Sequence, residues 1–278
     1  MGTGLVSRMA ADLILSVALS VVAAAAVMAV TALVARRQGR VAVVDVAWGA
    51  AFATAALACG AGAAARDAGS PARSWLLVAL VVLWGTRLAW HIGRRTARHD
   101  GEDPRYEKLL GGSLPEVGMG RAVRKVFALQ GALVPLIALP VSVGVVLEVR
   151  WWPAVAAGAL VWLVGIYFEA VGDAQLAAYR SRPRDQRPAV LDTGLWAWTR
   201  HPNYFGDACV WWGLWLAGGL ASGWVAGLAT VAAPAAMTWF LSEATGARLL
   251  EQTMMQRPGY PEYAARTARF VPRPPRRG

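Results

Sequence analysis

Long apolar segments alternate with polar connections along most of the chain. Seven of these segments approach the roughly 20 residues that a helix needs to cross the hydrocarbon core of a membrane. We expect them at Ala11–Ala35, Val41–Ala64, Ser74–Ile92, Val126–Glu148, Trp152–Ala174, Pro202–Leu220 and Trp224–Glu243. The pattern therefore predicts an all-α polytopic membrane bundle with about seven transmembrane helices.

Three prolines fall inside the predicted spans. Pro135 and Pro140 lie in the fourth span, and Pro234 lies in the seventh. Membrane helices tolerate proline because neighbouring groups satisfy the carbonyl that loses its N–H partner. We therefore expect a bend in each of these two spans.

The composition supports a membrane protein. Of the 278 residues, 56% are hydrophobic and only 16% are charged, whereas about a quarter of the residues are charged in an ordinary soluble domain. The first apolar run is longer than the core of a signal peptide and more spans follow it, so we expect a retained helix. Residues 1–278 show no internal repeat and no linker, which predicts one integral membrane domain.

Basic residues gather in alternate connections of the seven-span pattern. Of the 28 Lys and Arg residues, 23 fall in the first, third and fifth connections and in the tail. The positive-inside rule places these segments in the cytoplasm and the N-terminus outside. Much of the net charge of +11 is then a signal of orientation, so nucleic acid is not an expected partner.

The segment TRHPNYFGD, residues 199–207, places polar groups at the mouth of an apolar span. Pro202 suits the first position of a helix, and a helix N-terminus next to Arg200 favours an anion. Asn203 and Asp207 lie four residues apart on one helical face, and Tyr204 shares that side. These residues, with His201, predict a ligand site. An interfacial anchor, with Arg200 and Tyr204 at the membrane surface, is the alternative.

Two acids, Glu169 and Asp173, lie four residues apart in the fifth span. Like charges at this spacing repel each other unless each has a partner. Structural ion pairing and hydrogen bonding to a ligand both remain open. We expect no metal site, because the chain has three His and neither HExxH nor CxxC.

The third connection contains GEDPRYEKL, which begins at Gly101. Glu102 and Tyr106 belong either to a solvated loop or to a lid over the site, and spacing alone does not separate these interpretations. Arg87, near the end of the third span, can extend to the membrane surface or pair with an acid such as Asp45.

Several segments together resemble the steroid 5-alpha-reductase-like membrane family, and in particular its bacterial branch of unknown function. They are VDVAWG (44–49), LWGTRLAWHIGRR (83–95), GEDPRY (101–106), YFEAVGDAQLAAYR (167–180), GLWAWTRHPNYFGDACVWWG (194–213) and RPGYPEYAARTARFVPRPP (257–275). The strongest part of the resemblance covers residues 160–275. The wider superfamily includes NADPH-dependent sterol reductases and S-adenosylmethionine-dependent isoprenylcysteine and phospholipid methyltransferases.

The resemblance implies a cofactor cavity open to the cytoplasm of a bacterium, in a protein of the inner membrane. It implies cofactor contacts at Glu169, Asp173, Arg180, Asn203, Asp207 and Arg248, which we expect Arg200 and His201 to join. Glu169 stands where the animal steroid reductases have Asn, and the residues that polarise the steroid ketone have no clear match. The resemblance therefore implies cofactor binding more than steroid chemistry.

Two functions follow as expectations. The first is NADPH-dependent reduction of a C=C bond in a lipophilic enone that enters from the bilayer, with Tyr106, Tyr204 or Glu102 as the acid that polarises the carbonyl. The second is methyl transfer from S-adenosylmethionine bound at the same place, with which Glu251 and the GYPEY segment (259–263) of the tail are compatible. In both, the cofactor carries the chemistry and the protein orients it and excludes water. The expected partners are this lipophilic substrate and the membrane lipids.

The charge pattern generates a test of orientation. We expect reporter fusions near Arg66 and after Gly278 to lie on opposite sides of the membrane, because most basic residues fall on one side of the seven-span pattern. Paired enzymatic reporters that are active on only one side of the membrane would measure this. The same sidedness at both points would contradict the orientation.

Overall fold

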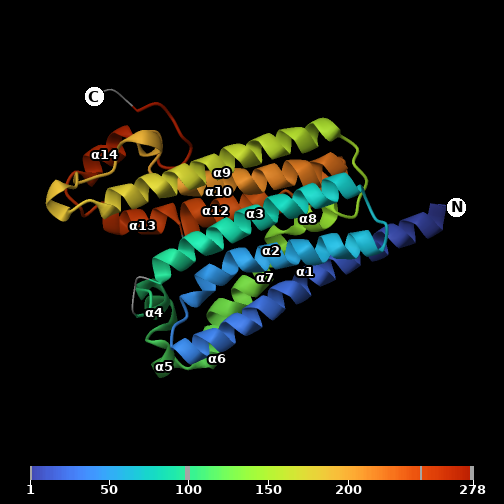
Figure 1. The fold of residues 1–278 in the computed structure, drawn as a ribbon, viewed down its shortest axis with the longest axis horizontal. Coiled ribbons are helices and arrows are strands. Elements are labelled where there is room, and N and C mark those ends of the chain that lie inside the picture. Colours follow the sequence, from blue (N-terminus) through green and yellow to red (C-terminus); the bar gives the residue numbers. More distant parts are fainter. Residues whose placement is uncertain (1, 98–100, 245, 276–278) are drawn as a thin grey trace. The chain divides into compact units, whose positions relative to one another are not determined.

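The computed structural model describes residues 2–97, 101–244 and 246–275, and every named element in these ranges is helical (Figure 1). The α-helices are α1 (Gly2–Gln38), α2 (Val43–Ala65), α3 (Pro71–Thr96), α4 (Pro104–Leu110), α5 (Leu114–Val117), α6 (Met119–Ala122), α7 (Ala128–Ile137), α8 (Leu139–Gly144), α9 (Trp152–Ser181), α10 (Pro202–Leu214), α11 (Trp224–Thr230), α12 (Ala232–Trp239), α13 (Ala247–Met254) and α14 (Tyr260–Arg266). Short π or 3₁₀ turns occupy Val123–Phe127, Arg184–Gln186, Gly194–Ala197, Trp215–Gly219, Leu220–Ser222 and Phe240–Ala244.

Five helical stretches in the described part of the chain are long and apolar enough to cross a membrane. They are Gly4–Gln38, Val43–Ala65, Pro71–Thr96, Trp152–Ser181 and Trp224–Met254. This confirms the expectation of an all-α chain with several apolar helices of membrane-spanning length.

The fourth and sixth predicted spans are not single long helices. Residues 126–148 divide between a π turn, α7 and α8, and the helix is interrupted at Ala138. Pro140, at the start of α8, has no N–H to continue the helical bonding. The chain also breaks between α11 and α12, three residues before Pro234. The sixth segment is α10, which has 13 residues and continues as a π turn.

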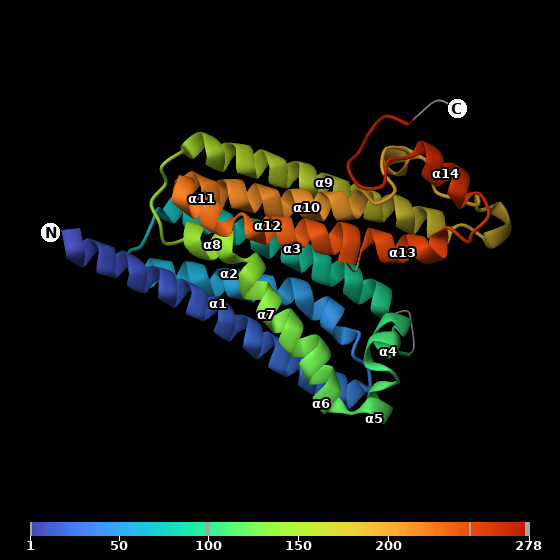
Figure 2. The ribbon, with the colours of Figure 1, turned by 180° about the vertical axis from the view of Figure 1, so that it is seen from behind.

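The chain divides into two compact units. The first unit contains residues 1–155 and 217–230, and the second contains residues 156–216 and 231–278. In the first unit, α1, α2 and α3 run side by side and α7 packs on α1 (Figure 2). Gly49 and Gly85 bring the backbones of α2 and α3 together, since a Cβ on either glycine would overlap the carbonyl of the other.

An arginine is fully buried in the first unit. Arg73, in the first turn of α3, is 0% exposed. Its Nη1 donates to Ser222 Oγ at 2.8 Å, and its Nη2 donates to the carbonyl of Leu147. A buried cation is costly unless it is paired or hydrogen-bonded. The two Nη atoms of Arg73 make such hydrogen bonds, and these bonds join three separate segments of the chain.

In the second unit, glycines hold α9 against α10. Gly158, Gly165 and Gly172 recur every seven residues along α9. Gly158 lies opposite Gly213, and Gly165 lies opposite Gly206. A Cβ on Gly165 would lie 2.6 Å from the carbonyl oxygen of Gly206. The two helices therefore run antiparallel with their backbones in contact, as small residues permit in membrane helix pairs.

This packing generates a prediction for Gly206. We expect Gly206→Ala to destabilise the protein by about 1–3 kcal/mol, because overpacking forces backbones apart. The new Cβ would lie 2.5 Å from the carbonyl oxygen of Gly165 and 2.7 Å from the N atom of Glu169. Thermal unfolding of the purified protein in detergent measures the effect.

Gly120→Ala is the matched control, because Gly120 is also helical and a Cβ there would meet no atom within 4 Å. This control should be neutral or slightly stabilising. Equal unfolding temperatures for Gly206→Ala and the wild type would show that α9 and α10 do not depend on this contact.

Candidate functional site

The helix α10 begins at Pro202, as predicted, with His201 at the position before it. Pro202 loses nothing at this position, because the first N–H groups of a helix have no intrahelical partner. Arg200 and His201 therefore stand at the positive end of α10.

A row of polar side chains lies along the contact between α9 and α10. Glu169 is 3% exposed, and its side chain lies against Gly206. One turn further along α9, Asp173 Oδ1 accepts from Asn203 Nδ2 at 3.3 Å. The carboxamide oxygen of Asn203 accepts from the N–H of Tyr204 at 3.1 Å. The structure thus brings together Glu169, Asp173 and Asn203, which the sequence placed in two separate spans.

His201 and Arg200 share one carboxylate, that of Glu251 on α13. His201 Nε2 lies 3.0 Å from Glu251 Oε1, and Arg200 Nε lies 3.1 Å from the same oxygen. The His201 ring is 3% exposed and stacks on Tyr204, with ring centroids 5.5 Å apart and planes 5° from parallel. Glu251 is therefore a member of this cluster, although the sequence had related it only to the methyltransferase alternative.

Two tyrosines of α14 extend this cluster. Burial and the Glu251 carboxylate raise the pKa of Tyr260 to about 12. Burial and the neighbouring Tyr260 also raise the pKa of Tyr263, whose hydroxyl donates to the carbonyl of Trp196 at 2.6 Å. Both hydroxyls stay protonated at neutral pH.

The C-terminal segment is bound to the loop that precedes α10. Arg200 N donates to the carbonyl of Ala268 at 2.9 Å, and Thr199 Oγ1 donates to the carbonyl of Phe270 at 2.8 Å. Thr199 and Ala268 also form a parallel bridge. The positions of Arg200 and His201 therefore depend on a C-terminal segment that lies about 70 residues later in the sequence.

The other predicted cofactor residues of the second unit are Asp207, Arg180 and Arg248. Asp207 is half-buried one turn after Asn203. Arg180 is exposed near the end of α9, where its carbonyl accepts from Arg187. Arg248 is exposed and lies 4.0 Å from Glu243. Of the predicted cofactor residues, Arg180 and Arg248 are thus exposed to solvent.

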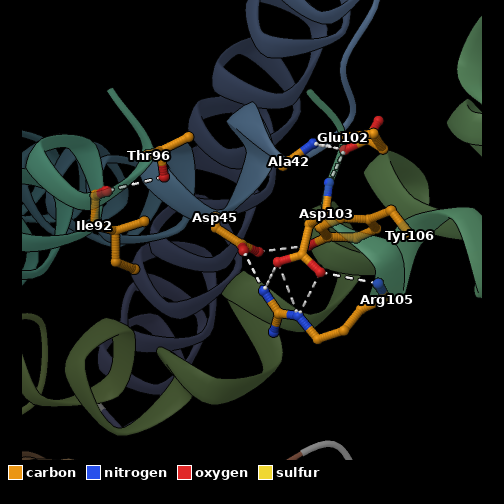
Figure 3. Close-up of polar contacts among 8 residues, drawn as sticks. All are labelled: Ala42, Asp45, Ile92, Thr96, Glu102, Asp103, Arg105 and Tyr106. Carbon is orange, nitrogen blue, oxygen red and sulfur yellow. Dashed lines mark hydrogen bonds and ion pairs between the residues drawn. The ribbon is translucent and has the colours of Figure 1, made fainter. Parts of the chain in front are cut away.

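Glu102 belongs to the first unit and caps α2 (Figure 3). Its carboxylate accepts from the backbone N–H of Val41 and, at 3.0 Å, of Ala42. It also accepts from the N–H of Asp103 at 3.0 Å. A carboxylate at a helix N-terminus is stabilised by the free N–H groups and the helix dipole. Glu102 therefore has a structural role in addition to any catalytic one.

Tyr106 and Arg105 bind Asp45, in the first turn of α2 (Figure 3). The Tyr106 hydroxyl donates to Asp45 Oδ1, and Arg105 Nη2 lies 2.9 Å from Asp45 Oδ2. Burial raises the pKa of Asp103, but its hydrogen bonds to Arg105 outweigh this, and the net pKa is lowered. Through these residues GEDPRY fastens α4 to the start of α2.

The fold and these clusters define a helical membrane protein with ionisable groups held at helix ends and along a helix contact. A family model described as "Protein of unknown function (DUF1295)" matches residues 31–267, and the chain belongs to this family. No curated protein and no solved structure matches the chain.

The Tyr106 contact generates a prediction. Burial and the charge of Asp45 raise the pKa of Tyr106, so its contribution to stability is present below the ordinary pKa of about 10 and is lost at higher pH. We expect Tyr106→Phe to destabilise the protein by about 1–2 kcal/mol at neutral pH, because Asp45 loses a donor. Thermal unfolding at pH 7 and above pH 10 measures both effects.

Tyr167→Phe is the control, since Tyr167 is 56% exposed, and we expect it to leave stability unchanged. An unaltered unfolding temperature in Tyr106→Phe would show that the hydroxyl does not fasten α4 to α2.

Proposed function

We propose that this protein is an NADPH-dependent membrane reductase that acts on a C=C bond of a lipophilic enone. The observation that carries the proposal is the polar row of Glu169, Asp173 and Asn203 between two apolar helices. Ionisable groups within membrane helices are costly and mark functional sites. The resemblance to the steroid 5-alpha-reductase-like family supplies the class of cofactor.

The donor set of the second unit fits a dinucleotide. Carboxylates such as Asp173 and Glu169 accept hydrogen bonds from ribose hydroxyls, as acidic residues do in dinucleotide-binding folds. The amide of Asn203 can both donate to and accept from a nicotinamide carboxamide. Arg200 and the N-terminus of α10 suit a phosphate.

The loop before α10 and the C-terminal tail carry an excess of positive charge. Residues 176–201 and 243–275 contain ten arginines and five acids. Arginine binds phosphate in a bidentate manner, so this excess favours a cofactor with an additional 2′-phosphate. Arg180 and Arg248 lie at the exposed edge, where such a phosphate would remain partly hydrated.

Bound NADPH would supply a hydride to the β-carbon of the enone. The chain would orient the cofactor, exclude water through the apolar faces of its helices, and place a proton donor near the carbonyl oxygen. Within the second unit Tyr204 is the candidate donor, since it is half-buried and stacked on His201. Tyr106 and Glu102, the other candidates from the sequence, are bound to the start of α2 within the first unit.

The same proposal assigns an orientation and a location. Seven passages through the inner membrane of a bacterium, with the N-terminus outside, would place the α10 start and the tail in the cytoplasm. NADPH is available in that compartment, and the substrate would enter from the bilayer.

Cofactor titration tests the proposal. We expect the purified protein to bind NADPH more tightly than NADH, and Asn203→Ala and Asp207→Ala to weaken NADPH binding about ten- to hundredfold. This is the effect of losing one buried hydrogen bond of about 1–3 kcal/mol. Affinity and unfolding temperature, measured together in detergent, separate a ligand contact from a structural one.

Asp185→Ala is the control, because Asp185 is an exposed acid of the same unit. If the Asn203 and Asp207 variants bind NADPH normally but lose much stability, these residues have a structural role and do not contact the cofactor. Binding of S-adenosylmethionine in place of NADPH would instead assign the protein to the methyltransferases.

A further inference from the structure

A cavity of about 260 Å³ lies at the turn between α2 and α3 in the first unit. Its walls come from the end of α2, including Gly60 and Ala64, and from the start of α3, including Ser74 and Trp75. Among the described residues that line the cavity, Asp67 in the turn is the only one with a charged side chain. None of these residues belongs to the proposed cofactor site.

The turn that carries Asp67 is held in place by the backbone. The N–H groups of Arg66 and Ala68 donate to the carbonyl of Ala63 at 3.2 and 3.0 Å. Gly69 packs so closely on the 145–147 segment that a Cβ would lie 2.6 Å from the carbonyl oxygen of Val145. The cavity is therefore bounded by a preorganised turn.

Asp67 adopts an unusual backbone conformation. Its φ is +49°, and no other non-glycine residue in the described part of the chain has a positive φ. Asp and Asn enter this region more readily than other side chains, but at some cost in free energy. Here the conformation ends α2 as a C-terminal cap, in which the N–H groups of Asp67 and Ala68 donate to the carbonyls of Ala64 and Ala63. No ion pair to Asp67 occurs among the described residues.

The surroundings of the Asp67 carboxylate favour an organic cation. The C-terminal end of α2 carries the negative end of the helix dipole, and the cavity lies against it. Trp75 is 49% exposed and lines the same space. An aromatic face next to a carboxylate is a common arrangement for binding ammonium groups.

Positive charge lies next to this acidic position. Arg66 pairs through Nε with the buried Asp12. Arg8 Nη2 donates to the carbonyl of Arg66 at 2.7 Å. The N-terminus of α3, which begins at Pro71 in the cavity wall, adds partial positive charge. An anion adjoining the cation would therefore also be stabilised.

We propose that this cavity binds the zwitterionic head group of an amine-bearing phospholipid, with the ammonium at Asp67 and Trp75 and the phosphate toward Arg8 and Arg66. The charges of the site complement those of the head group. The cavity lies where two helices of membrane-spanning length meet, and Trp is enriched at such membrane surfaces. A lipid is thus favoured over a soluble amine.

Native mass spectrometry of the full-length protein from mixed phosphatidylethanolamine and phosphatidylglycerol tests the proposal. We expect the wild type to retain phosphatidylethanolamine in preference to phosphatidylglycerol. Asp67→Asn should reduce this preference about tenfold, because it removes a charge-assisted hydrogen bond. Asn also tolerates positive φ, so the turn should keep its conformation.

Glu107→Gln is the matched control, because Glu107 is an exposed acid of the same unit on α4. Equal retention of the two lipids by the wild type would overturn the proposal, as would an unchanged preference in Asp67→Asn or an equal loss in Glu107→Gln. Binding of glycerophosphoethanolamine as tight as that of phosphatidylethanolamine would overturn the assignment to a lipid and identify the free head group as the ligand.

Discussion

The candidate site depends on how closely α9 approaches α10. Glycines at positions 158 and 165 of α9 face Gly213 and Gly206 of α10, so the two backbones touch without intervening side chains. At this separation the short side chains of Asp173 and Asn203 reach each other. Larger residues at the glycine positions would move the helices apart and separate these polar groups. The polar row is therefore a consequence of the backbone contact.

Charge within apolar helices imposes a second constraint, which the first unit meets in several ways. Arg73 is buried with a hydroxyl and a carbonyl as acceptors, and Arg66 neutralises Asp12. Asp45 is bound by Tyr106 and Arg105 from a helix that lies 60 residues later in the sequence. Each cluster joins segments distant in sequence, because a charge removed from water must find its partners within the protein.

The sequence predicted local features well and long-range contacts poorly. Apolar runs located the helices, and proline chemistry located the start of α10 and the interruptions near Ala138 and Val231. The contacts of Asp45 with Arg105 and Tyr106 were not predictable by spacing, because about 60 residues separate the partners; the sequence had suggested only Arg87. The contact of Glu251 with His201 spans 50 residues and depends on the fold of the tail. The seven-residue spacing of glycines in α9 indicates a helix contact and could have been recognised in the sequence.

The second unit contains two polar clusters: the group of Arg200, His201 and Glu251, and the polar row of Glu169, Asp173 and Asn203. The carboxylate oxygen Oε1 of Glu251 lies close to both His201 Nε2 and Arg200 Nε. Asp173 and Glu169 lie instead on α9, beside the amide of Asn203. Glu251 therefore holds Arg200 and His201 in place before α10, whereas the α9 carboxylates belong to the polar row beside α10. Because the same carboxylate connects α13 to the α10 start, the position of the tail and the position of Arg200 are coupled.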